Sequence, residues 1–404
     1  MRFTSYIVTM PVRLVLLLAI ILSSCQEKGA GTYSYDLAFL GRHDPTIIEL
    51  TDKTGNSRVI VSAKYQGRVM TSTSSGETGN SYGWINYNLI AANKYKKQFN
   101  PVGGEERFWL GPEGGQYSLY FAPGDSFDIR NWQVPPVIDT ISYDVIERTD
   151  TSAVFEQTAS LRNFSGTEFN LSVTRRIELL SRDQIEDELD IALHKDLDVV
   201  GYQSFSAIVN QGTTQWQKET GLMSIWLLGM FTPSPSTTVI IPFSQGYDSL
   251  ITTDYFGEIP PDRLEVRDGV LLFTCDGKFR SKIGLPPHVT KSYAGSYDAE
   301  KEILTIIRFG VDVYGNYVNS KWEIQDEPYK GDALNSYNDG PLADGTQLGP
   351  FYELESSSPA MQLKPGETQT YSQITCHFEG DEESLRSVAK TLLGFDINEL
   401  TTKE

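Results

Sequence analysis

Two glutamates near the C-terminal end are the residues whose spacing is best suited to chemistry. Glu353 and Glu355 lie in the segment GPFYELESSSPA, residues 349–360. Alternate residues of a β-strand project from one face, so a strand here puts both carboxylates on the same side, about 7 Å apart. Like charges at this distance repel each other. The pair therefore predicts either a face open to water or a polar ligand between the carboxylates.

A glycine-rich segment, GGEERFWLGPEGG at residues 103–115, brings together Arg107, Trp109 and Glu113. An indole ring offers a flat apolar surface to the C–H face of a sugar, and a guanidinium offers a fork of donors to hydroxyls or a carboxylate. These residues could line the mouth of a β-sandwich. A structural loop, with Arg107 paired to Glu113 and Trp109 in the core, accounts for the segment equally well.

A second polar segment, GDALNSYNDGPLADG at residues 331–345, leads almost directly into the glutamate pair. Amides and carboxylates each offer paired hydrogen-bonding atoms to vicinal hydroxyls. The candidate ligand-facing residues are Asn335, Tyr337, Asn338 and Asp339. Turns of the same composition are common without any ligand, so a purely structural role stays open.

Acid–base chemistry near neutral pH would also use a proton donor such as histidine. The chain has His43, His194, His288 and His377. His288, in the proline-stiffened loop GLPPHVTK, and His377, in the last predicted strand, are the strongest of the four, although a single histidine is more often structural. No Cys/His cluster has the spacing of a zinc site, and we predict neither a metal nor a cofactor.

Short strand-like segments bounded by turns make up most of the chain that would position these residues. They are residues 58–73, 116–122, 151–161, 169–180, 185–194, 201–212, 237–243, 269–275 and 302–310. Closely spaced strands of this kind predict an all-β sandwich or barrel. One helix is expected after Asp381, because Leu385, Val388 and Leu392 recur at helical spacing and Gly394 suits a helix end.

The N-terminal residues predict export and a lipid anchor. Arg2 and Arg13 precede the apolar run LVLLLAIIL, which is short for a transmembrane helix and typical of a signal peptide. The run ends in LSSC, where small residues before Cys25 resemble a bacterial lipobox; an ordinary secretory signal is the alternative. We expect a signal peptide at 1–24, a tether at 25–35, one domain at 36–404, and a location on the bacterial cell envelope.

Charge and cysteine content narrow the class of partner. A formal net charge of −19 argues against nucleic acid and anionic membranes as partners, so membrane attachment would come from lipid on Cys25. Only Cys275 and Cys376 remain for a disulfide. The sequence leaves open whether they pair or are buried as small apolar residues. The oligomeric state is not predicted.

Two stretches resemble the galactose mutarotase-like (aldose 1-epimerase-like) superfamily. FYELESSSPAMQLKPGETQTYSQITCHF, residues 351–378, is similar to its closing strands, and VIVSAKYQGRVMTST, residues 59–73, to its opening hairpin. The combination of GGEERFWLGPEGG, NSYNDGP and FYELESSSPA looks more closely like an uncharacterised group of Bacteroidetes-type lipoproteins with this fold. The resemblance covers most of residues 45–380.

The resemblance implies a large antiparallel β-supersandwich with a C-terminal helix and a concave face for carbohydrate. In the epimerases a late-strand glutamate removes the proton of the anomeric hydroxyl, and this residue corresponds to Glu355. A histidine that protonates the ring oxygen is expected near FSAIVNQG, where this chain has Asn210. Glu353 would support Glu355, and His288, His194 or Lys282 could replace the histidine. The alternatives are a non-catalytic glycan-binding lipoprotein and a structural component of the envelope.

Overall fold

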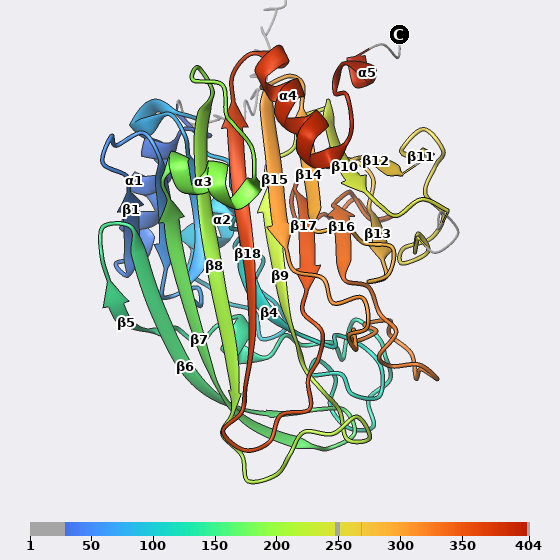
Figure 1. Ribbon diagram of the computed structural model, residues 1–404. Helices are drawn as coiled ribbons and strands as arrows, with labels where there is room; N and C mark the ends of the chain where they lie inside the picture. The colour runs from blue at the N-terminus through green and yellow to red at the C-terminus, as the bar shows by residue number, and fades with distance from the viewer. Residues whose placement is uncertain (1–28, 247–250, 268, 402–404) are drawn as a thin grey trace, which may run out of the picture. The chain divides into compact units, whose positions relative to one another are not determined.

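The structure is a computed structural model that describes residues 29–246, 251–267 and 269–401 (Figure 1). The chain divides into two compact units, residues 1–30 and residues 31–404, and every element below belongs to the second. The predicted signal peptide and Cys25 lie outside the described residues. Helix α1 (Tyr33–His43) includes the last three residues of the predicted tether, 33–35.

A ten-stranded antiparallel sheet is the largest element of this unit (Figure 1). Its strands, in spatial order, are β11 (Leu264–Arg267), β12 (Val270–Thr274), β10 (Thr237–Pro242), β14 (Tyr293–Asp298), β15 (Ile303–Phe309), β18 (Thr368–Glu379), β8 (Asp198–Asn210), β7 (Glu168–Leu180), β6 (Ser152–Arg162) and β5 (Asp144–Arg148). The strand-like segments 151–161 and 169–180 correspond to β6 and β7, which pair antiparallel with residue 152 opposite residue 178.

Two smaller antiparallel sheets complete the β structure. The five-stranded sheet has the order β13 (Ser281–Leu285), β16 (Leu334–Asn338), β17 (Tyr352–Ser357), β9 (Ser224–Phe231) and β4 (Arg107–Gly111). The three-stranded sheet contains β1 (Ile47–Thr51), β2 (Arg58–Ser62) and β3 (Arg68–Thr73). All strand pairings are antiparallel among the described residues, so the predicted all-β class is confirmed.

The main hydrophobic core takes side chains from all three sheets, including Phe155 of β6, Leu354 of β17 and Val59 of β2. Strand residues alternate between this core and the opposite face of their sheet. On β17 the alternation sends Tyr352 and Ser356 toward the ten-stranded sheet, where they hydrogen-bond Ser296 at 2.8 Å and Gln373 at 2.7 Å. Glu353 and Glu355 therefore project from the other face, away from the ten-stranded sheet.

The C-terminal helix is confirmed as α4 (Glu382–Leu393). The Asp381 side chain accepts a hydrogen bond from the Ser384 amide, and Gly394 ends the helix at φ 65°, a backbone conformation that glycine adopts without strain. Apolar residues of α4 pack with Ile185 and Leu189 on the outer face of the ten-stranded sheet, forming a second core cluster. Figure 1 shows α3 and α4 lying across this face.

The structure corrects two predicted strands. Residues 182–189 form helix α3 (Arg182–Leu189), because Ser181 and Gln184 make a reciprocal capping box and Ile185 and Leu189 share one buried face. Residues 116–122 form an irregular loop after β4, since Pro112 lacks the N–H that would continue the ladder.

Helices are also more numerous than the single one expected. The others in the described residues are α1, α2 (Tyr87–Ala92), α3, α5 (Asn398–Thr401), η1 (Gly76–Thr78) and η2 (Pro136–Ile138). Within the described residues, no helix combines the length and the apolar character that a bilayer crossing requires.

Cys275 and Cys376 are free and buried, so they are buried as small apolar residues and do not pair in a disulfide.

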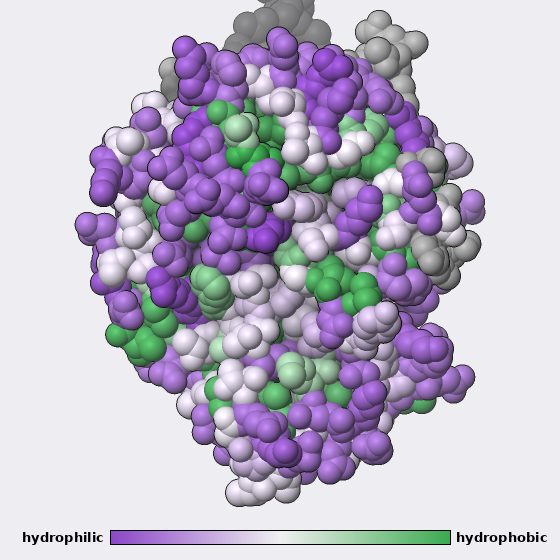
Figure 2. All heavy atoms as spheres, in the orientation of Figure 1, coloured by the Kyte–Doolittle hydropathy of each residue, from purple (hydrophilic) through white to green (hydrophobic). Residues whose placement is uncertain are grey.

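Hydrophilic residues dominate the face of the unit that carries α3 and α4 in Figure 1. The space-filling view of the same face is largely purple, with smaller green patches between the polar groups (Figure 2). This distribution agrees with the acidic composition of the chain, whose calculated isoelectric point is 4.7.

Candidate functional site

The outer face of the five-stranded sheet gathers the polar residues singled out in the sequence. Glu355 lies opposite Asn335 of β16, and Glu353 lies opposite Tyr337 of the same strand. On the other side of β17, Glu355 pairs with Leu228 of β9, which in turn pairs with Arg107 of β4. Residues far apart in the chain therefore share one face of the sheet.

Glu353 forms an ion pair with Arg107 at 2.6 Å between Oε1 and Nη2, and both side chains are buried. Burial raises the pKa of Glu353 to about 7; the Arg107 guanidinium opposes this shift and the nearby Glu355 carboxylate adds to it. The guanidinium pairs with Glu353 and not with Glu113, which was the alternative that the sequence left open.

Glu355 is 1% exposed and is held on one side only. Its Oε2 accepts hydrogen bonds from the Trp226 indole Nε1 at 3.1 Å and from the Lys282 ammonium at 2.8 Å. Its Oε1 is buried without a hydrogen-bond partner among the described residues. A buried carboxylate oxygen normally has a partner, so this atom is the most distinctive feature of the face.

Lys282 contacts Glu355 and also acts electrostatically on two further glutamates, Glu353 and Glu113. Burial raises the pKa of Glu113 and the Glu355 carboxylate adds to this shift, while Lys282 and the indole groups of Trp132 and Trp322 act in the opposite direction. Asp332 accepts a hydrogen bond from the Tyr255 hydroxyl, and burial raises the pKa of Asp332 as well, while Lys282 opposes this shift. Several acids here therefore hold their protons to higher pH than free carboxyls.

Aromatic rings enclose the carboxylates. The Trp109 ring is only 4% exposed, and the Arg107 guanidinium lies over it with Cζ 4.3 Å from the ring centroid. Trp109 also contacts Trp226, with ring centroids 5.6 Å apart. Its indole Nε1 has no hydrogen-bond partner among the described residues. Trp109 is thus part of a buried aromatic wall and is not an exposed platform for a sugar.

The segment 331–345 divides between the two faces of its strand. Asn335 and Tyr337 lie on the carboxylate face, where Asn335 Nδ2 donates to the Tyr255 hydroxyl at 3.3 Å and the Tyr337 hydroxyl donates to Asp339 at 2.7 Å. Asn338 projects from the opposite face and bonds the Phe279 carbonyl and the Gly277 amide, both at 2.9 Å. Asn338 therefore anchors a neighbouring loop and does not face the carboxylates.

No histidine is among the described residues that hydrogen-bond Glu355. His288 is exposed in the turn after β13, and the described side chains that hydrogen-bond Glu355 are Trp226 and Lys282. His377 is buried between the sheets, 2.9 Å from the Thr305 hydroxyl and 3.2 Å from Glu105. Asn210, at the position where the resemblance places a histidine, donates from Nδ2 to the carbonyls of Thr214 and Leu363.

Sequence reasoning missed Tyr255 and Asp332 and did not foresee the central place of Lys282. Lys282 lies opposite Tyr337 in the register of β13 and β16, which no local pattern reveals. Among the described residues, no group of three or more His, Cys, Asp or Glu side chains is arranged to hold a metal ion.

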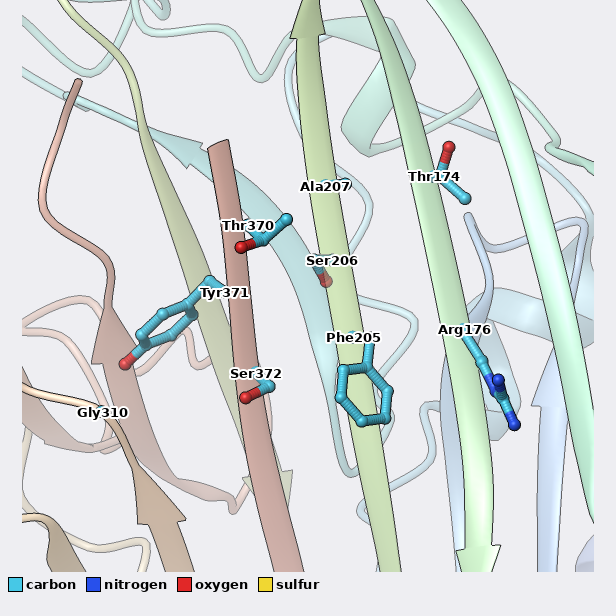
Figure 3. Close-up of a pocket in the computed structure, with 9 residues that line it drawn as sticks. All are labelled: Thr174, Arg176, Phe205, Ser206, Ala207, Gly310, Thr370, Tyr371 and Ser372. Atoms are coloured by element: carbon cyan, nitrogen blue, oxygen red, sulfur yellow. The ribbon is translucent and has the colours of Figure 1, made fainter. Parts of the chain in front are cut away.

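Two surface hollows lie away from this face. A groove of about 470 Å³ crosses the outer side of β7, β8 and β18, where Phe205 and Arg176 project among small hydroxyl-bearing residues (Figure 3). A second hollow, of about 640 Å³, lies beside α4 and includes His194 and Asp381. Glu353 and Glu355 line neither hollow, and Glu353 is only 5% exposed.

The sequence matches one family model. Residues 31–404 match DUF6786, which is described as a family of unknown function. The chain belongs to the DUF6786 family. No curated protein is similar in sequence to it.

Solved structures identify the fold of this DUF6786 chain. A putative aldose 1-epimerase from Escherichia coli K12 has a TM-score of 0.50 at 13% identity, and the match covers 83% of this chain and 99% of that one. A galactose mutarotase-like protein from Lactobacillus casei ATCC 334 has a TM-score of 0.48 at 10% identity, with coverage of 82% and 100%. The match to the E. coli structure confirms the galactose mutarotase-like fold, and at 13% identity the likeness extends to the fold alone.

The protonation of Glu353 predicts a pH-dependent stability. Between pH of about 4.5 and 7 the folded state holds a proton on Glu353 that the unfolded state has lost. This contribution to stability is complete below the unfolded pKa and is lost as pH rises through about 7. We expect Glu353→Gln to flatten the fall in stability across this interval, by at most about 1.4 kcal/mol per pH unit for one proton.

Urea unfolding at pH 5, 6, 7 and 8 measures this effect as the difference between the parent chain and the variant. Exposed Glu168→Gln serves as the matched control, since its side chain is 64% exposed. Parallel stability curves for the parent and Glu353→Gln would show that Glu353 is ionised throughout.

Proposed function

We propose that this protein binds carbohydrate at the outer face of the five-stranded sheet and processes it by acid–base chemistry centred on Glu355. The observation that carries the proposal is the asymmetry of that carboxylate. Oε2 is fixed by Trp226 and Lys282, while Oε1 is buried and has no hydrogen-bond partner in the described part of the chain. A positioned acceptor of this kind is what removal of a hydroxyl proton requires.

The neighbouring groups supply the other functions that such a step needs. Glu355 would accept the proton of a sugar hydroxyl. Lys282, 2.8 Å away, would donate a proton to the ring oxygen of the sugar. Arg107 has two buried N–H groups, Nε and Nη1, without partners among the described residues, and these would orient the sugar oxygens. The name aldose 1-epimerase, carried by the E. coli structure, suggests an anomeric carbon as the reacting centre.

A second candidate is glycan binding without catalysis. The observation in its favour is Asn210, which stands where the resemblance to epimerases expects a histidine and whose side chain is engaged by backbone carbonyls. In this reading the same face holds the sugar, and Lys282 only neutralises the buried carboxylates. Proton transfer from a bound sugar separates the two candidates.

A glycan array followed by ligand-observed NMR tests the proposed function. The full chain is probed with neutral and acidic mono- and oligosaccharides, and the anomeric protons of any bound sugar are followed by exchange spectroscopy. Binding with accelerated anomeric exchange supports processing, and binding without exchange supports the second candidate. The proposal of a carbohydrate site fails if no sugar binds.

We also propose that the protein is an envelope lipoprotein anchored through Cys25. The support is the LSSC sequence after an apolar run and the resemblance to Bacteroidetes-type lipoproteins. Cys25→Ala is expected to abolish incorporation of a fatty-acid label and to release the protein from the membrane fraction, because a lipid chain supplies the attachment. Unchanged labelling of the variant would rule out this anchor, and Cys275→Ala is the control.

A further inference from the structure

Two arginines lie side by side at one edge of the carboxylate face. An isolated antiparallel bridge pairs Val69 with Glu106, so Arg68 of β3 stands directly opposite Arg107 of β4. Opposite residues of an antiparallel pair project from the same face with Cβ atoms about 5 Å apart. Like charges at such positions destabilise a sheet unless anions compensate them.

The protein only partly neutralises the positive charge of the arginine pair. Arg68 donates to the Gly103 carbonyl at 2.8 Å and to the Gln66 side chain at 3.3 Å, both neutral acceptors. Burial, with Arg107 as the next contributor, lowers the pKa of Arg68 to about 9, while Asp139 opposes the shift. Asp139 acts electrostatically on Arg68, and Glu353 pairs with Arg107; burial raises the pKa of both acids.

Unused hydrogen-bond donors outnumber unused acceptors at this place. Arg68 Nε, Arg107 Nε, Arg107 Nη1 and Trp109 Nε1 are buried without partners among the described residues, against one acceptor, Glu355 Oε1. A neutral sugar hydroxyl always brings an O–H donor of its own together with its acceptor oxygen. A carboxylate or sulfate offers only acceptors, and it matches the guanidinium fork.

The loop above the arginines is basic in an otherwise acidic chain. Lys94, Lys96 and Lys97 are exposed and form no ion pair with other described residues, and the sequence has no Asp or Glu between residues 78 and 104. The loop covers the pair directly: the Phe99 ring centroid is 5.7 Å from Arg107 Cζ, and Asn100 Nδ2 donates to Asp139 at 2.7 Å. Exposed lysines on the loop next to the arginines would attract an anionic ligand.

We propose that the ligand of this site is an acidic sugar whose carboxylate or sulfate group is bound by Arg68 and Arg107. This inference rests on the proposed carbohydrate function and adds the substrate class. Glu355 and Lys282 would then meet the sugar ring, while the lysines of the loop would guide the anion toward the buried arginines. Charge-assisted hydrogen bonds to the guanidinium groups would distinguish acidic sugars from their neutral counterparts.

Matched pairs of sugars test the inference by isothermal titration with the full chain. The probes are methyl galactoside against methyl galacturonoside, methyl glucoside against methyl glucuronoside, and galactose against galactose 6-sulfate. We expect at least one acidic member to bind about tenfold or more tightly than its neutral partner. The uronide and sulfate arms show which anion is recognised.

Two variants locate the anion site. Arg68→Gln is expected to reduce the acidic preference to within about twofold, and exposed Arg162→Gln, which removes the same charge elsewhere, is expected to leave it unchanged. Because Arg68 is buried, a surface variant that cannot disturb the core is also needed. Joint replacement of Lys94, Lys96 and Lys97 by glutamine is expected to weaken binding of the acidic sugar severalfold at low salt, with the loss disappearing near 0.5 M salt.

The outcomes separate this inference from the proposed function. Equal affinity for acidic and neutral partners, or tighter binding of the neutral ones, overturns the acidic substrate class while the carbohydrate function stands. An acidic preference that survives both Arg68→Gln and the lysine variant places the anion elsewhere and also overturns the inference. Failure of every sugar to bind overturns the proposed function, and this inference with it.

Discussion

Replacing Glu355 by glutamine is expected to lower sugar turnover at least about a hundredfold while sugar affinity stays within about tenfold of the parent. Glutamine keeps the shape of the side chain but cannot accept a proton. Its amide can still meet the Trp226 indole or the Lys282 ammonium, which both contact Oε2 of the native residue. Loss of turnover with retained affinity is the signature of a group that acts in the chemical step.

Anomeric exchange rates of the bound sugar measure this effect, with affinity determined in the same samples. Glu168→Gln, an exposed change of the same type, is the control for general effects of the substitution. If Glu355→Gln interconverts the two anomers as fast as the parent, another group is the base. Loss of affinity by more than about a hundredfold would instead make Glu355 a binding residue.

Arg175→Met is expected to destabilise the fold by about 3–5 kcal/mol, because it leaves Glu106 charged and unpaired in the core. Glu106 Oε1 meets Arg175 Nη2 at 2.6 Å, and neither side chain is exposed. Ser204 and Gln373 hold the other carboxylate oxygen, at 2.9 and 3.2 Å, and burial raises the pKa of Glu106. Removing the Arg175 guanidinium therefore leaves the buried Glu106 carboxylate without the cation that stabilises its charge.

Urea unfolding of three variants separates the ion pair from simple loss of packing. The double change Glu106→Gln with Arg175→Met is expected to recover part of the loss, since no buried charge remains. Arg162→Met, which breaks the exposed pair with Glu168 at 3.4 Å, is expected to cost less than about 1 kcal/mol. A cost below about 1 kcal/mol for Arg175→Met would contradict a dominant role for this pair.

Glu106 precedes Arg107, so the same contact also fixes the start of β4 beside the carboxylate face.

The fold was predictable where local chemistry and tertiary structure agree. The alternating strands and the cap at Asp381 carry their signals within a few residues. The failure at 182–189 shows the limit of periodicity alone, because the capping box at Ser181 outweighed a strand-like composition. The spacing of Ser181 and Gln184, three residues apart at the start of the segment, is the sequence signal that would have identified the helix.

The candidate site was predictable only in part. The shared face of Glu353 and Glu355 follows from alternation, and the same rule would have placed Asn338 on the other face from Tyr337. The partners of these residues come from strands far away in the chain. The Arg107–Glu353 ion pair spans 246 positions, and Lys282 reaches Glu355 across β16. Such contacts depend on sheet order, which no local pattern in the sequence specifies.

The most direct test of the carboxylate face is the indole N–H NMR spectrum during a sugar titration. The chain has six tryptophans, so each indole N–H can be assigned by single Trp→Phe variants. The account predicts that a binding sugar shifts the indole signals of Trp226, which donates to Glu355, and Trp109, while Trp216, packed against Phe169 elsewhere, stays unchanged. A sugar that binds with the Trp226 and Trp109 signals unmoved would contradict the account, because its site would then lie on another part of the molecule.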